Sequence, residues 1–150
     1  MSGIRAVAQT AEVATGTSIK TIMQLSAAAN HRVHVKEISI SFDGISNTAA
    51  PILVQVIRQT DAGTMSALTI NKVSESDQET LQTTATHTAT AEPTGAATTS
   101  VLSEQVHPQA GYTWQAPFGG DIVIEGGDRL GIAVTAGADV NAVARFIFEE

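Results

Sequence analysis

The chain has 150 residues, a formal net charge of −7 and no cysteine, and its basic residues form no cluster. This composition excludes disulfides and cysteine nucleophiles, and it provides no basic surface that would neutralise a nucleic-acid backbone. No apolar run approaches the roughly 20 residues that cross a bilayer. Because β-branched residues are abundant and only 15% of residues are charged, the sequence predicts a single all-β domain with no nucleic-acid or membrane partner.

The chain begins with a weakly patterned segment, residues 1–16, which is small and polar. We expect this segment to form an extended N-terminal arm, followed by one β-sandwich domain over residues 17–150. Residues 17–25 then alternate between apolar and polar side chains, which is typical of a half-buried strand.

Residues 32–42 predict a second strand in which the apolar positions change parity. Val33 and Val35 occupy odd positions, whereas Ile38 and Ile40 occupy even ones. One extra residue near Lys36, a β-bulge, would return all of these side chains to the same face. The turn residues at 43–44 end the strand.

The middle of the chain contains one clear strand and two less regular segments. Residues 51–60 are almost continuously apolar, as in a strand covered on both faces. Residues 65–73 predict another strand, and residues 76–82 carry the cap and early acids of a short helical turn. Residues 83–99 are rich in Thr and Ala, so they predict either a flexible loop, the favoured interpretation, or an extended segment laid over a neighbour.

The last third of the chain is dense in predicted strands, at 100–107, 112–118, 122–124, 130–134 and 140–148. The whole chain shows no alternation of strand and helix. The sequence therefore predicts an antiparallel β-sandwich or jelly roll of about eight to nine strands.

The residues with catalytic or metal-binding chemistry are scattered. His31, His34 and Glu37 lie on one predicted strand, but residues three apart point to opposite faces, and His31 and Glu37 are roughly 20 Å apart. His87 and His107 are isolated, and the chain has no nucleophile elbow, phosphate loop or dinucleotide fingerprint. We therefore expect no catalytic, cofactor-binding or metal-binding residue and no enzymatic activity.

Three aromatic residues, Tyr112, Trp114 and Phe118, share one face of a predicted strand. Such a stripe has two interpretations. It packs into the core, which is the favoured one, or it forms an exposed platform for a carbohydrate ring.

Several phrases of the sequence resemble one group of proteins, the small capsid decoration, or cement, proteins of tailed bacteriophages. The similarity spans roughly residues 15–150, and its motifs are structural rather than catalytic. The phrases are Ala-Ala-Asn-His-Arg-Val-His-Val-Lys-Glu at 28–37, Ile-Ser-Phe-Asp-Gly at 40–44, Thr-Ala-Glu-Pro-Thr at 90–94, Gly-Gly-Asp-Arg-Leu-Gly-Ile at 126–132 and Phe-Ile-Phe-Glu-Glu at 146–150.

The resemblance implies a homotrimer on the outer capsid surface of the virion, assembled in the bacterial host cytoplasm, that bridges subunits of the phage major capsid protein. Residues 1–16 and 83–99 are the segments that we expect to reach neighbouring subunits, by strand addition or by extended contact. Two alternatives stay open: another virion component, such as a tail, fibre or head-completion protein, and a carbohydrate-binding jelly-roll module.

Overall fold

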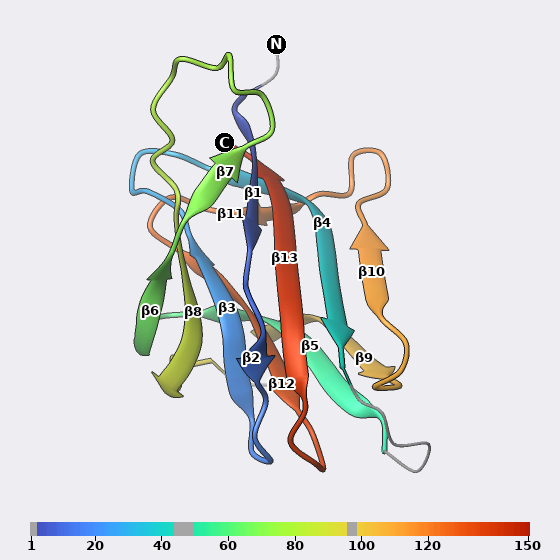
Figure 1. The fold of residues 1–150 in the computed structure, drawn as a ribbon. Helices are drawn as coiled ribbons and strands as arrows, with labels where there is room; N and C mark the ends of the chain where they lie inside the picture. The colour runs from blue at the N-terminus through green and yellow to red at the C-terminus, as the bar shows by residue number, and fades with distance from the viewer. Residues whose placement is uncertain (1–2, 44–49, 96–98) are drawn as a thin grey trace.

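The computed structural model describes residues 3–43, 50–95 and 99–150, and it folds into two antiparallel sheets that face each other (Figure 1). Sheet A contains, in spatial order, β10 (Tyr112–Gln115), β4 (Val33–Phe42), β13 (Asn141–Glu149), β1 (Arg5–Gln9) and β7 (Ile70–Lys72), with β11 (Ile122–Ile124) beside β4 and β2 (Val13–Ala14) beside β13. Sheet B contains, in spatial order, β6 (Thr64–Leu68), β8 (Thr84–Ala91), β3 (Lys20–Ser26), β12 (Arg129–Thr135), β5 (Ile52–Gln59) and β9 (Ser100–Val106).

The predicted all-β sandwich is confirmed, although the described residues form thirteen strands rather than eight or nine. The four additional strands are β1, β2, β7 and β8. β1 and β2 lie within residues 1–16, where we expected an arm. β7 is additional because residues 65–73 are divided between two strands, β6 and β7. β8 lies within residues 83–99, where we expected a loop.

The core lies between the two sheets and follows the alternation of the strands. On β13, Ala142, Ala144, Phe146 and Phe148 are all fully buried. Aliphatic side chains of β3, β4, β5 and β12 complete this cluster. Along β13 the buried side chains therefore change from small at its start to large at its end, and they fill the space opposite sheet B.

The predicted β-bulge in β4 is confirmed at Lys36. Ile147 of β13 pairs with Glu37, while the next residue, Phe148, pairs with Val35. Lys36 is therefore the extra residue, and it returns Ile38 to the buried face that Val35 occupies.

Strand β5 is covered on both faces, as its apolar run predicts. Val54 and Val56 point into the core, and Ile57 is buried on the opposite side. There, the chain between β8 and β9 crosses β5, and Thr60 donates its backbone N–H to the carbonyl of Thr94 at 2.9 Å.

The described part of residues 1–16 contributes the strands β1 and β2 to sheet A. β1 pairs with β13 on one side and with β7 on the other. Ala6 and Ala8 are fully buried, but their small side chains give a weak apolar period, and this hid the strand in the sequence. The two chain ends lie side by side (Figure 1), because Ile4 and Glu150 exchange backbone hydrogen bonds. Residues 1–2 lie outside the described part.

The favoured loop interpretation of residues 83–99 was wrong, because β8 pairs with both β3 and β6. Ala85 and Ala89 are its buried positions, and Thr88 has a φ of 57° that interrupts the alternation between them. Residues 96–98 lie outside the described part. The expected helical turn at 76–82 was also wrong, because these residues form a loop without helical hydrogen bonding.

Candidate functional site

His31, His34 and Glu37, the residues with metal-binding chemistry on the predicted strand, do not converge on one point. His31 lies in the connection between β3 and β4, whereas His34 on β4 places its Nδ1 3.4 Å from Oδ2 of Asp121. Glu37 accepts a hydrogen bond from Arg145 at 2.5 Å. Among the described residues, no group of three His, Cys, Asp or Glu side chains is arranged to hold a metal ion.

The two isolated histidines bind within their own segments. His87 places its Nδ1 2.8 Å from the hydroxyl oxygen of Thr88 on the same strand. His107 accepts the backbone N–H of Gln109 at 3.1 Å and so closes the turn after β9. These contacts explain the two imidazoles as local structural groups.

The three aromatic residues do not share one environment. Tyr112 and Trp114 are half-buried and pack against the core, which agrees with the favoured interpretation for these two. Burial, followed by the nearby Glu104 carboxylate, raises the pKa of the Tyr112 phenol. Phe118 is instead fully exposed, at 109%, because the chain leaves sheet A after β10 and carries this residue outward on a turn.

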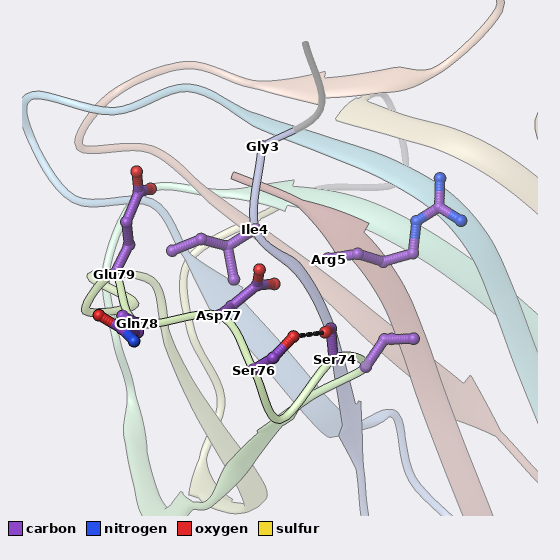
Figure 2. A pocket seen from close by; sticks show the side chains of 9 residues that line it. Gly3, Ile4, Arg5, Ser74, Ser76, Asp77, Gln78 and Glu79 are labelled. Carbon is purple, nitrogen blue, oxygen red and sulfur yellow. Dashed lines mark hydrogen bonds between the residues drawn. The ribbon is translucent and has the colours of Figure 1, made fainter.

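A first hollow, of about 600 Å³, lies between the start of β1 and the loop at 73–79. Figure 2 shows Ile4 directed toward this loop, beside the Asp77 carboxylate, while Arg5 points to the other side of the strand. The hollow is lined mainly by hydroxyl, amide and carboxylate groups. Lys72 anchors the loop because its ammonium donates to the backbone carbonyls of Asp77 and Glu79.

The solvent-facing side of β1, β13 and β4, which we call the open face, has an apolar centre. Val7 and Ile147 are directly opposite each other on adjacent strands and form this centre, and Val143 lies further along β13, beyond Arg145. All three are half-buried because neighbouring strands flank them. The described residues place no second layer over these side chains, so the open face has apolar groups accessible to a partner.

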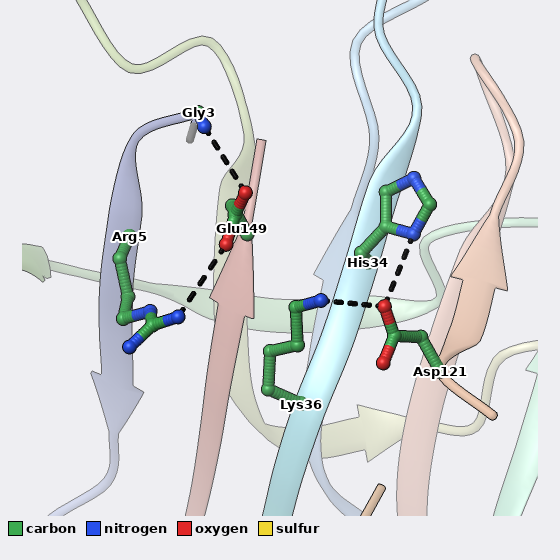
Figure 3. A network of polar contacts seen from close by, with 6 residues as sticks. All are labelled: Gly3, Arg5, His34, Lys36, Asp121 and Glu149. Carbon is green, nitrogen blue, oxygen red and sulfur yellow. Dashed lines mark hydrogen bonds and ion pairs between the residues drawn. The ribbon is translucent and has the colours of Figure 1, made fainter. Parts of the chain in front are cut away.

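Figure 3 shows charged contacts at two places on sheet A, one between β1 and β13 and one beside β4. Arg5 and Glu149 face each other across β1 and β13 at 3.6 Å, and Lys36 binds Asp121 at 2.5 Å. The hydrogen bond from Lys36 holds the pKa of the Asp121 carboxyl below its ordinary value, and His34 adds to this effect. Surface pairs of this kind contribute only about 0–1 kcal/mol each, so their main effect is to fix the charge pattern of the face.

A second hollow, of about 510 Å³, lies on the open face itself, and we call it the face hollow. Its lining combines apolar side chains with polar and charged ones, of which Arg5 is exposed while Lys36 and Glu37 are half-buried. The lining residues are Arg5, Lys36, Glu37, Val73, Gln115, Ala116 and Ile147.

One feature of the sequence indicates the open face: apolar residues at positions of β13 that alternate with its buried ones. In residues 141–149, the positions between the buried residues of β13 include Val143 and Ile147, which are apolar. A strand that faced only water would alternate more strictly between apolar and polar residues. The ion pairs had no comparable signal, because Arg5 and Glu149 are far apart in sequence.

Comparisons of the chain with protein-family models, with curated proteins and with solved structures find no match. The described residues include no helix long and apolar enough to cross a membrane. The functional assignment therefore depends on the residues and their geometry.

Proposed function

We propose that this chain is a virion structural protein, a capsid decoration or cement protein that binds the outer surface of a tailed-phage head. The observation that carries the proposal is the open face, where the apolar pair Val7 and Ile147 lies between the ion pairs Arg5–Glu149 and Arg145–Glu37, with Val143 beyond Arg145. Such a surface suits the binding of another protein, because its apolar centre can be desolvated while its charged rim fixes orientation.

The choice of a phage head comes from the sequence resemblance at residues 28–37 and 126–132, not from the open face. In this proposal the chain forms a homotrimer, and each protomer makes a modest contact with the major capsid protein. Three linked contacts bind far more tightly than one because of their high effective concentration. Shell subunits bridged in this way resist separation.

The structure changes which part of the chain we assign to these contacts. β1 is hydrogen-bonded to strands on both sides, and so is β8. Residues 6–8 of β1 and 85–87 of β8 therefore lack the free backbone edge that strand addition requires. The open face takes their place as the contact surface of the proposal.

The copy number of the chain in purified phage particles tests the proposal. Quantitative mass spectrometry should find the chain in numbers comparable to those of the major capsid protein, because a cement protein occupies repeated lattice positions. A few copies per particle would instead indicate a tail, fibre or head-completion component. Absence from the particles would overturn any virion role.

A further inference from the structure

Two polar atoms of sheet B are buried and have no hydrogen-bond partner among the described residues. They are the side-chain oxygen Oε1 of Gln24 on β3 and the Nε–H group of Arg129 on β12. The whole Gln24 side chain is buried, at 0% exposure. Because buried polar groups of folded proteins nearly always have a partner, both atoms require one.

The strand register places these two atoms near each other, on the side of sheet B that faces away from the core. Gln24 lies opposite Gly131 of β12, and Arg129 is two residues from Gly131 and therefore on the same face. Diagonal neighbours of this kind are roughly 7–8 Å apart, which long side chains can span.

Asp61, in the turn after β5, lies beside both side chains. Gln24 donates to the Asp61 backbone carbonyl at 3.0 Å. Hydrogen bonds from the side chain and backbone of Thr94, and then from Gly63, lower the pKa of the Asp61 carboxyl, and the charge of Arg129 lowers it further. Gln24 and Arg129 therefore converge on the same place in the sheet.

The direction of the Gln24 amide is fixed by a chain of hydrogen bonds that starts at Glu92. The Glu92 carboxylate accepts the Thr21 hydroxyl proton at 2.7 Å, so this hydroxyl accepts from the Gln59 amide nitrogen at 3.0 Å. The Gln59 oxygen then accepts from the Gln24 amide nitrogen at 2.7 Å. A reversed Gln24 amide would place oxygen against two acceptors, the Gln59 oxygen and the Asp61 carbonyl. Oε1 of Gln24 is therefore the atom that needs a proton donor.

A single partner for both atoms has to donate a proton to Oε1 and accept one from Nε–H. A cation would be repelled by Arg129, and an anion would be repelled by the Asp61 carboxylate. A neutral hydroxyl group meets both requirements, and water is its smallest form. We infer that one water molecule is bound between Gln24 and Arg129, where it joins β3 to β12. This site lies on sheet B, so it is independent of the proposed function of the open face.

Nuclear magnetic resonance of the natural chain in solution tests this site. A water held there should give cross-peaks to the Arg129 Nε–H proton that have opposite signs in NOE and ROE spectra, which separates a bound water from proton exchange. Arg5, whose side chain is 57% exposed, is the internal control and should give no such pair of cross-peaks. The absence of the pair at Arg129 would overturn the inference.

A substitution tests whether Arg129 holds the water. In Arg129→Met the water loses its donor partner, so the NOE from water to the Gln24 side-chain amide should fall several-fold. The matched control is Arg32→Met, which removes an arginine side chain that is 61% exposed and should leave this NOE unchanged. An undiminished NOE in Arg129→Met would contradict the site.

A high-resolution crystal structure of the natural chain gives a second, independent measurement. It should show one ordered water within about 2.7–3.2 Å of both Oε1 of Gln24 and Nε of Arg129. A protein group donating to Oε1 in place of the water would overturn the inference.

Discussion

At the residue scale, the least expected feature is a buried polar network on the side of sheet B that faces away from the core. Gln24, Gln59 and Thr21 are almost completely buried there. Gln24 donates to the Gln59 side-chain oxygen at 2.7 Å, and Gln59 donates to the Thr21 hydroxyl at 3.0 Å. Gly131 makes room for this arrangement, because a Cβ at its position would lie 2.2 Å from the Gln59 oxygen.

Substitution of Gly131 by Ala should therefore destabilise the protein. The added methyl group displaces the Gln59 amide and leaves buried hydrogen-bonding groups unpaired, at a cost of about 1–3 kcal/mol in the free energy of unfolding. Urea denaturation measures this cost. The matched control is Gly137→Ala, where a Cβ meets nothing within 4 Å, and we expect its effect to stay within about 0.5 kcal/mol.

A double-mutant cycle identifies the cause of this effect. In a Gln59→Ala background the clash with the amide is absent, so Gly131→Ala should cost clearly less than in the natural chain. An identical cost in both backgrounds would mean that the Gln59 network does not explain the requirement for glycine.

At the element scale, the sequence predicted those strands whose buried faces are built from large side chains. The alternation of β13, the apolar run of β5 and the bulge at Lys36 were all readable, because a change of one residue in register moves such side chains between core and solvent. The strands β1 and β8 could not be recognised in the sequence, because their buried positions are all Ala, which differs little in hydrophobicity from the residues around it. Their burial depends on strands distant in sequence.

Asp61 forms hydrogen bonds to two segments that are distant from each other in the sequence. Its carboxylate accepts the backbone N–H of Gly63 at 3.0 Å and that of Thr94 at 3.1 Å, and so ties the β5–β6 turn to the crossing segment after β8. Hydrogen bonds from the Thr94 side chain and then its backbone hold the pKa of the Asp61 carboxyl below its ordinary value, with a further contribution from Gly63.

This lowered pKa predicts that part of the stability depends on pH. The folded state binds fewer protons than the unfolded chain near pH 4, so the contribution is fully present above the unfolded pKa and is lost as the pH falls through the lower folded pKa. The free energy of unfolding of Asp61→Asn, measured from pH 6 to pH 3, should therefore fall less steeply than that of the natural chain. Parallel pH profiles for the two proteins would refute this role of Asp61.

At the scale of the whole molecule, the sequence predicted the class of fold better than the contact surface. Core residues recur at every second position of a strand, so the sequence itself reveals them. The open face is formed by β1, β4 and β13, which become neighbours only in the folded sheet. The same reasoning explains Phe118, which the strand pattern placed with Trp114 until the turn at 117–120 separated them. Which side chains of a β-sandwich are exposed depends on how its strands and loops cover one another, and this is decided only in the folded protein.

The central claim is that the open face binds the phage head, and the most direct measurement is the affinity of variants for heads that lack this protein. Val143→Asp places a charge at an apolar position of the open face and should weaken binding about tenfold or more, equivalent to about 1.4 kcal/mol. Val101→Asp makes the same change on β9, away from the open face, and should bind as the natural chain does, provided that both variants have the natural melting temperature. Equal binding by Val143→Asp and Val101→Asp, or no binding by the natural chain, would contradict the claim.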